Sequence, residues 1–196
     1  MVTEEAVQRP ELAGHATTVL SQSAFKAIAD AETPQGIAAE IAIPKPRLVK
    51  GDCVFLEGIQ DAGNVGAIIR SAAAFGVGSI VLDRACADPW SPKVLRAAAG
   101  GHFALSIQQV ASLEDALESF RGRLLCTVAR GGQALGALPA GQVGWIFGSE
   151  GAGVSPGVQG RASAKVTIPV AAAMESLNVA ATAAICFYSR APQGIT

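Results

Sequence analysis

CVFLEGIQDAGNVGAIIRSAAAFGVGSIVL, residues 53–82, joins two apolar segments through an alanine-rich one. Residues 53–58 and 79–82 are apolar runs short enough to be buried strands. Residues 64–76 between them are helical in composition, with Asn64 available as the N-cap and Gly76 as the C-terminal stop. Strands that are apolar throughout and are joined by a helix are typical of a parallel sheet covered on both faces.

The chain beyond this stretch repeats the alternation. Apolar runs predict strands at 103–107, 124–128, 144–148 and 164–170, and we expect helices at 91–101, 112–120 and 176–190. Ser91 followed by Pro92, and Ser112 three residues before Asp115, are helix start signals. The sequence therefore predicts an α/β domain in which helices flank a parallel sheet.

The first 46 residues differ from this pattern. They contain two short helical segments, Glu4–Leu12 and Ser21–Asp30, and end in the linker-like Pro44-Lys45-Pro46. A segment this small cannot build its own core. We expect a leader with linker over 1–46, left from a larger domain or packed as an arm, and a main domain over 47–196.

Composition favours a folded protein of the cytoplasm. Hydrophobic residues make up 50% of the chain and charged residues 16%, which argues against disorder. No apolar run approaches the roughly 20 residues that span a bilayer, and acidic residues stand where a signal peptide has basic ones. Residues 1–45 carry 3 basic and 6 acidic side chains and residues 46–196 carry 12 and 10, a balance that allows RNA binding without requiring it.

The four cysteines lie in apolar surroundings and lack the spacing of zinc ligands, so we expect buried free thiols and no metal. A serine-hydrolase elbow is the other pattern to test, because Gly153–Gly157 reads GVSPG. Pro156 has no N–H to donate to an oxyanion, and no histidine follows His102. We interpret Ser155 as a helix N-cap with Pro156 in the first helical position.

Three other segments carry polar residues that the apolar pattern does not require. Arg70 interrupts an alanine-rich helix, although it could equally be a solvated residue on the outer face. Glu150 follows a strand and stands in a glycine-rich turn, a common place for sites in open α/β sheets. Ser176 and Asn178 open the last helix, and capping explains one of them but hardly both.

In this order, the segments resemble the three motifs of the SpoU-type RNA 2′-O-ribose methyltransferases of the SPOUT superfamily. Residues 61–76 resemble the family pattern DPGNxGAIIRxAxxFG, residues 148–153 resemble GxEGxG, and residues 168–180 resemble IPM…SLNVS. Ala62, Val170 and Ala180 depart from these patterns at supporting positions. The resemblance covers roughly residues 50–190.

The resemblance implies that the C-terminal part of the sheet is threaded as a trefoil knot, that the protein is a homodimer, and that it binds S-adenosylmethionine (SAM). It implies methyl transfer to a ribose 2′-hydroxyl of structured RNA, with ribosomal RNA as the first candidate substrate and transfer RNA as the second. The implied cofactor-binding residues are Thr127, Ala129, Gly148, Ser149, Gly151, Ile168, Ser176 and Leu177. The implied catalytic residues are Asn64, Arg70, Glu150, Ser176 and Asn178.

Family roles can be placed on these residues. The family gives the arginine at position 70 the task of activating the 2′-hydroxyl, opposite the partner subunit's cofactor. A guanidinium is a poor base, so a phosphate clamp that steadies the developing alkoxide is physically easier. Asn64 and Asn178 would position the ribose and Glu150 would order the site. The alternative to a methyltransferase is a non-catalytic RNA-binding or ribosome-assembly module with the same fold. Residues 33–36 resemble the end of the substrate-binding domain that many family members carry upstream.

Overall fold

The computed structural model describes residues 1–15, 17–29, 31, 33–47, 51–136 and 140–191. The chain divides into two compact units, Met1–Lys45 and Pro46–Thr196. In the described residues, no helix is both long and apolar enough to cross a membrane.

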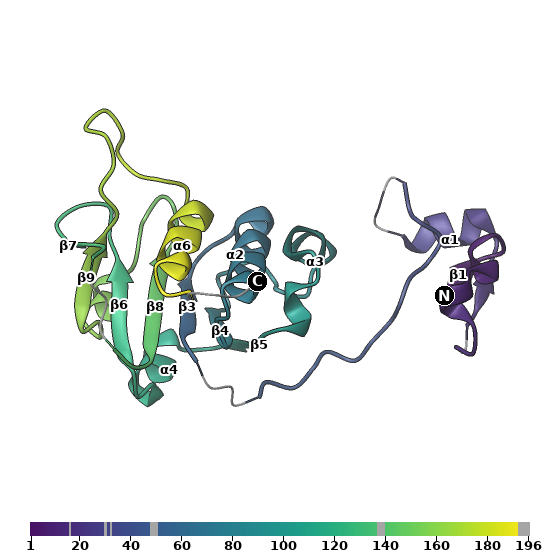
Figure 1. Ribbon diagram of the computed structural model, residues 1–196, viewed down its shortest axis with the longest axis horizontal. Coiled ribbons are helices and arrows are strands. Elements are labelled where there is room, and N and C mark those ends of the chain that lie inside the picture. Colours follow the sequence, from purple (N-terminus) through teal and green to yellow (C-terminus); the bar gives the residue numbers. More distant parts are fainter. Residues whose placement is uncertain (16, 30, 32, 48–50, 137–139, 192–196) are drawn as a thin grey trace. The chain divides into compact units, whose positions relative to one another are not determined.

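The second unit is built on a parallel sheet (Figure 1). Its described strands lie in the order β5-β4-β3-β8-β6-β9-β7. Their bounds are β3 Cys53–Glu57, β4 Ser79–Asp83, β5 Ser106–Val110, β6 Arg123–Thr127, β7 Gln133–Ala134, β8 Val143–Gly148 and β9 Ala164–Thr167. All the pairings are parallel, which confirms the α/β class. From β3 the chain winds outward through β4 to β5, and it then crosses to β6 and the edge strand β7 before it inserts β8 between β3 and β6, and β9 between β6 and β7.

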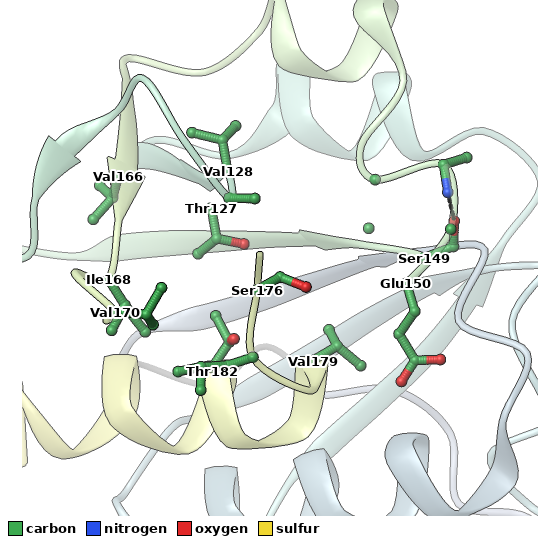
Figure 2. Close-up of a pocket in the computed structure, with 16 residues that line it drawn as sticks. Thr127, Val128, Ser149, Glu150, Val166, Ile168, Val170, Ser176, Val179 and Thr182 are labelled. Carbon is green, nitrogen blue, oxygen red and sulfur yellow. Dashed lines mark hydrogen bonds between the residues drawn. The ribbon is translucent and has the colours of Figure 1, made fainter. Parts of the chain in front are cut away.

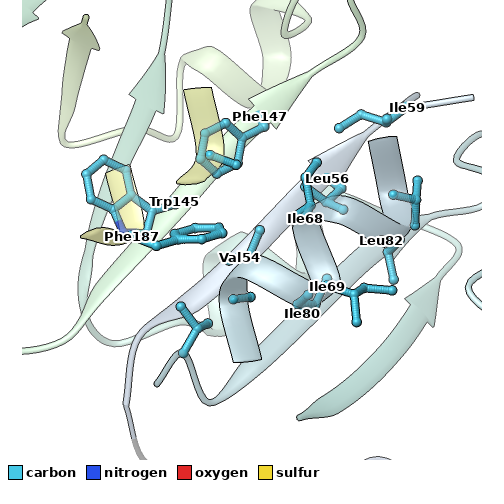
Figure 3. Close-up of a cluster of buried hydrophobic side chains, with 14 of the residues drawn as sticks. Val54, Leu56, Ile59, Ile68, Ile69, Ile80, Leu82, Trp145, Phe147 and Phe187 are labelled. Atoms are coloured by element: carbon cyan, nitrogen blue, oxygen red, sulfur yellow. The ribbon is translucent and has the colours of Figure 1, made fainter. Parts of the chain in front are cut away.

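Helices cover both faces of this sheet. Their bounds are α2 Ala62–Ala74, α3 Pro92–Ala98, α4 Leu113–Ser119, α5 Pro156–Gln159 and α6 Val179–Tyr188, with a 3₁₀ turn, η3, over Gly101–Phe103. Alternation along the strands divides the core. Val54 of β3 and Trp145 of β8 pack under α2 and α6 (Figure 3), whereas Phe55 packs against α4 on the opposite face. The continuous apolar strands therefore supply two cores, as a sheet buried on both faces requires.

Helix α2 is longer than predicted at its start. Asp61, not Asn64, is its N-cap: the Asp61 carboxylate accepts the backbone N–H of Asn64 at 2.8 Å. The prediction of an Asn64 cap was therefore wrong, because a good capping residue stands three positions earlier. Gly76 follows the helix with φ +76°, as the predicted stop requires. The Asn64 side chain is free for another task.

Other helix and strand boundaries differ from the predicted ones by a few residues. The strand predicted at 103–107 starts at Ser106, because η3 occupies Gly101–Phe103. The strand at 164–170 ends at Thr167, before Pro169, and the last helix spans Val179–Tyr188 rather than 176–190. Ser112 and Ser155 cap α4 and α5 as predicted. The trefoil knot stays a prediction.

The first unit is small and has little regular structure. It contains β1 (Val2–Thr3) paired with β2 (Val19–Leu20), two 3₁₀ turns at Ala6–Gln8 and Pro10–Leu12, and α1 (Gln22–Ile28). The helix predicted over Glu4–Leu12 is thus two 3₁₀ turns divided at Arg9, since Pro10 cannot donate the next helical hydrogen bond. The Asp30 end of the other predicted helix lies outside the described residues.

Candidate active site

A pocket of about 340 Å³ lies at the carboxyl ends of β6, β8 and β9. Figure 2 shows Ile168 and Val170 at one end of it and Glu150 at the other. Its lining comes from the ends of these strands, the loops that follow them and the start of α6: Thr127, Val128, Ala129, Gly148, Ser149, Glu150, Gly151, Ala152, Gly153, Val166, Ile168, Val170, Ser176, Leu177, Val179 and Thr182. Segments that are far apart in the sequence therefore form one apolar cavity with polar groups at its rim.

The structure brings all the predicted cofactor-binding residues to this pocket. The sequence did not predict the lining residues Ala152, Gly153, Val166, Val170, Val179 and Thr182. Helical spacing could have found Thr182, which lies one turn after Asn178. Strand alternation could have found Val166, two residues before Ile168.

The loop after β8, residues 148–153, forms one wall of the pocket and is folded tightly on itself. Gly153 has φ +69° and its N–H donates to the Ser149 carbonyl at 2.9 Å. Gly148 packs so closely on this turn that an added Cβ would lie 2.2 Å from the Gly153 carbonyl carbon. At Gly151 an added Cβ would meet nothing within 4 Å. The two glycines thus serve different needs, close packing at 148 and an open backbone at 151.

Three predicted polar residues form a cluster at the rim. The Asn64 and Asn178 amides both donate to Glu150 Oε1, the latter at 3.2 Å. The Asn178 amide also donates to Asn64 Oδ1 at 2.9 Å. Glu150 forms no ion pair within the described part of the chain. The cluster is therefore a carboxylate held by amide donors.

Asn178 also caps the last helix. Its Oδ1 accepts the backbone N–H groups of Ala180 at 2.9 Å and Ala181 at 3.2 Å, while its Nδ2 belongs to the cluster. One side chain thus both starts α6 and fixes the position of two predicted catalytic residues. Ser176 needs no capping role, and it lines the pocket.

Arg70 lies apart from the other predicted catalytic residues. It is exposed on α2, does not line the pocket, and has no hydrogen bond or ion pair with any residue that the structure describes. The structure therefore brings Asn64, Glu150, Ser176 and Asn178 to one pocket rim and leaves Arg70 outside it.

Nucleophilic chemistry by serine or cysteine does not fit this arrangement. The Ser155 hydroxyl donates to Glu57 at 2.6 Å, and His102 is buried against the Pro89 carbonyl at 2.7 Å. Cys126 adjoins the pocket residue Thr127, but burial raises the pKa of its thiol to about 11, so the thiol stays protonated at neutral pH. The four cysteines are free and buried, as predicted.

Comparisons with known proteins agree with these features. Residues 52–188 match the model of the SpoU rRNA Methylase family. The 23S rRNA (guanosine(2553)-2′-O)-methyltransferase RlmP of Bacillus subtilis is 35% identical over 174 residues, covering 87% of this chain and 70% of the relative.

Solved structures also resemble the chain, and two of them illustrate the likeness. A TrmH-family protein of Porphyromonas gingivalis has a TM-score of 0.75 and 34% identity, over 89% of this chain and 74% of that one. The SpoU methyltransferase AviRb of Streptomyces viridochromogenes, in complex with the cofactor AdoMet, has a TM-score of 0.68 and 26% identity, over 75% of this chain and 64% of that one. The chain thus spans only part of each relative. Both the motif positions and the family model lead to one assignment: the chain belongs to the SpoU rRNA Methylase family.

Proposed function

We propose that the chain transfers the methyl group of SAM to the 2′-hydroxyl of a ribose in structured RNA. The observation that carries this proposal is the junction of an apolar pocket with the cluster of Asn64, Glu150 and Asn178. A pocket at the carboxyl edge of a parallel sheet suits a small cofactor. The amide cluster at its rim suits a polar acceptor that must be oriented.

The pocket fits SAM in size and in chemistry. Its volume of about 340 Å³ lies in the range of small-molecule sites. Ile168 and Leu177 offer apolar surface to an adenine ring, and Gly151 leaves backbone open to the cofactor. SAM supplies an electrophilic methyl group on a sulfonium.

The polar residues orient the acceptor in this proposal. Asn64 donates one N–H to Glu150, which leaves its second N–H for a ribose hydroxyl. Glu150 fixes both amides, and Ser176 presents its hydroxyl to the pocket. Holding the 2′-oxygen in line with the methyl group accounts for much of the rate gain, because orientation is lost in free solution.

Arg70 acts in this proposal from a second copy of the chain. Its exposure and lack of a described partner suit a residue that completes the site of another subunit. There its guanidinium would hold an RNA phosphate and steady the developing alkoxide.

A homodimer would also cover an exposed apolar surface. Ile185 and Tyr188 of α6, 39% and 71% exposed, lie on a helix that packs against α2. Phe103 of η3, which also packs against α2, is 80% exposed. Exposed apolar groups that gather around one helix are typical of an interface.

Ribosomal RNA is the proposed substrate, with transfer RNA second, and the cytoplasm the proposed location. The Bacillus subtilis relative, a methyltransferase of 23S rRNA, supports this order. We propose that residues 1–46 are a leader derived from a substrate-binding domain, and that residues 47–196 form the catalytic domain.

The decisive experiment measures tritium transfer from labelled SAM to ribosomal and transfer RNA fractions, followed by mapping of 2′-O-methyl positions. We expect incorporation into ribosomal RNA. Confirmed SAM binding without incorporation into any fraction would instead support the non-catalytic assembly module. Incorporation into bases and not riboses would contradict the proposed reaction.

A further inference from the structure

Glu57, which the sequence analysis did not single out, binds Ser155, two residues beyond the 148–153 loop. Its Oε2 accepts the Ser155 backbone N–H at 2.7 Å and its Oε1 accepts the Ser155 hydroxyl at 2.6 Å. A carboxylate that accepts two hydrogen bonds from one residue fixes that residue in both position and orientation. Ser155 is thereby attached to the end of β3.

The place of Glu57 in the sheet gives this contact its importance. Glu57 is the last residue of β3 and lies opposite Gly148 in the register with β8. The 148–153 loop begins at Gly148, the last residue of β8, and leads to Ser155, the N-cap of α5. The strand register therefore fixes the start of the loop, and Glu57 fixes the residue that follows its end. Val154, which stands between the loop and Ser155 in the sequence, is buried in the core under α4.

The same strand leads to the other half of the site. Gly58 follows Glu57 with φ +64°, and both carboxylate oxygens of Asp83 accept its N–H at 3.1 Å. Asp61 then starts α2, which carries Asn64 to Glu150. Glu57 therefore joins the segment that carries Asn64 to the loop that carries Glu150.

We infer that Glu57 is a positioning residue for cofactor binding, because its bonds to Ser155 hold the 148–153 loop in the shape that receives SAM. The inference rests on the proposed function, since it assigns SAM to this pocket. Glu57 does not line the pocket, so it acts only through the loop. Its carboxylate forms no ion pair with a described residue, and Ser155 supplies its described hydrogen bonds.

The test compares Glu57→Ala with Glu57→Gln. Alanine removes both bonds, and hydrogen bonds to a carboxylate are strong enough that we expect the Kd and KM for SAM to rise about tenfold. Glutamine retains one acceptor for the Ser155 N–H and offers an N–H to its hydroxyl, so we expect a rise of about threefold or less. The kcat at saturating SAM is expected to change less than KM in both variants.

Glu118→Ala is the matched control. Glu118 of α4 pairs with Arg161, just beyond α5, the helix that Ser155 caps. Its loss therefore weakens a contact at the other end of α5 and leaves the 148–153 loop unchanged. We expect unchanged SAM affinity in this variant. Calorimetric titration with SAM and a thermal melt are recorded for every variant.

The outcomes separate the two proposals. Wild-type protein that does not bind SAM would contradict the proposed function. Wild-type binding with equal affinity in folded Glu57→Ala would overturn the positioning role, as would equal losses in Glu57→Ala and Glu118→Ala. If Glu57→Ala does not fold, Ser155→Ala removes the hydroxyl bond to Glu57 and keeps the bond from the backbone N–H, so we expect the KM for SAM to rise about threefold. An unchanged KM in that variant would overturn the inference.

Discussion

The two edges of the parallel sheet both carry carboxylates, but they are satisfied in different ways. At the amino edge, Asp52 precedes β3 and pairs with Arg190, which follows α6, at 2.6 Å. Asp52 also accepts the Val143 N–H at 2.9 Å, and Arg190 donates to the Gly141 carbonyl at 2.6 Å. At the carboxyl edge, Glu57 and Glu150 accept bonds from hydroxyl, backbone and amide groups.

This difference separates stability from function. The Asp52 carboxylate is neutralised by the Arg190 guanidinium, so this pair joins the start of β3 to the end of α6 and offers no net charge to a ligand. Glu150 instead accepts hydrogen bonds from neutral amides and lies beside an open pocket, where a ligand can reach it. We therefore expect amino-edge variants to lower stability and carboxyl-edge variants to lower activity in a folded protein.

The largest effect is expected at Arg70, the cation that our proposal adds to the carboxyl edge from a second subunit. Arg70→Ala should lower methylation by about a thousandfold, because the developing alkoxide loses its stabilising cation. SAM affinity in calorimetry should stay nearly unchanged, since Arg70 does not line its own pocket. A collapse of SAM affinity together with activity would show the role to be wrong.

Gly148→Ala tests the tight fold of the 148–153 loop. A Cβ there would lie 2.2 Å from backbone of Gly153, so the loop must move, and we expect the Kd for SAM to rise up to about a hundredfold. Gly136→Ala is the control, because its Cβ would meet only the Ala134 carbonyl oxygen, at 3.7 Å, and Gly136 does not line the pocket. Similar SAM affinities for the two variants would contradict the packing argument.

Asp52→Ala tests the amino edge. Removing one partner of this pair leaves Arg190 beneath the end of α6 without its carboxylate, and we expect a loss of about 3 kcal/mol in the free energy of unfolding. Urea denaturation measures that loss. SAM affinity below the melting temperature should change less than about twofold, which is within one unit of RT. A loss of SAM affinity without a loss of stability would contradict the assignment of the amino edge to stability.

The smallest expected effect concerns the core beneath α6. Burial raises the pKa of the Cys186 thiol from 9.0 to about 12, so its contribution to stability is complete below pH 9 and is lost as the pH rises towards 12. Between pH 7.5 and 10, the free energy of unfolding of Cys186→Ala should therefore fall less than that of the wild type, by about 1 kcal/mol. Equal pH slopes in urea denaturation would show that the thiol does not contribute.

The sequence predicted β3, β4, β6 and β8 well because they are apolar over most of their length. The strand β5 contains Gln108 and Gln109 and starts later than predicted, and the short edge strand β7 was not predicted. Helix ends were harder, since Asp61 and Asn64 are both good caps and only the backbone decides between them. The leader was harder still, because Pro10 divides a segment whose composition suits a helix. Local sequence signals thus predicted that the helices and strands exist, whereas tertiary packing determines where they begin and end.

The eight residues that the motif resemblance assigns to the cofactor all line the pocket, and their role in binding it stays a prediction. The resemblance did not indicate how the polar groups at the rim connect. Asn178 was expected to cap a helix or to serve the site, and it does both because an amide has an acceptor and a donor. Glu57 was missed, although a carboxylate at the end of a buried strand before a glycine is the signal that pointed to Glu150. The contact between Glu57 and Ser155 spans 98 residues, and no local pattern encodes such a pair.

The double role of Asn178 makes the first turn of α6 a spectroscopic reporter of the site. The Ala180 and Ala181 amide protons are held by the same side chain that binds Asn64 and Glu150. Their hydrogen-exchange rates should therefore respond when a ligand or a Glu150 variant disturbs the cluster, although neither alanine lines the pocket. Two backbone signals would then follow the assembly of the site without a label, a substrate or an enzymatic assay.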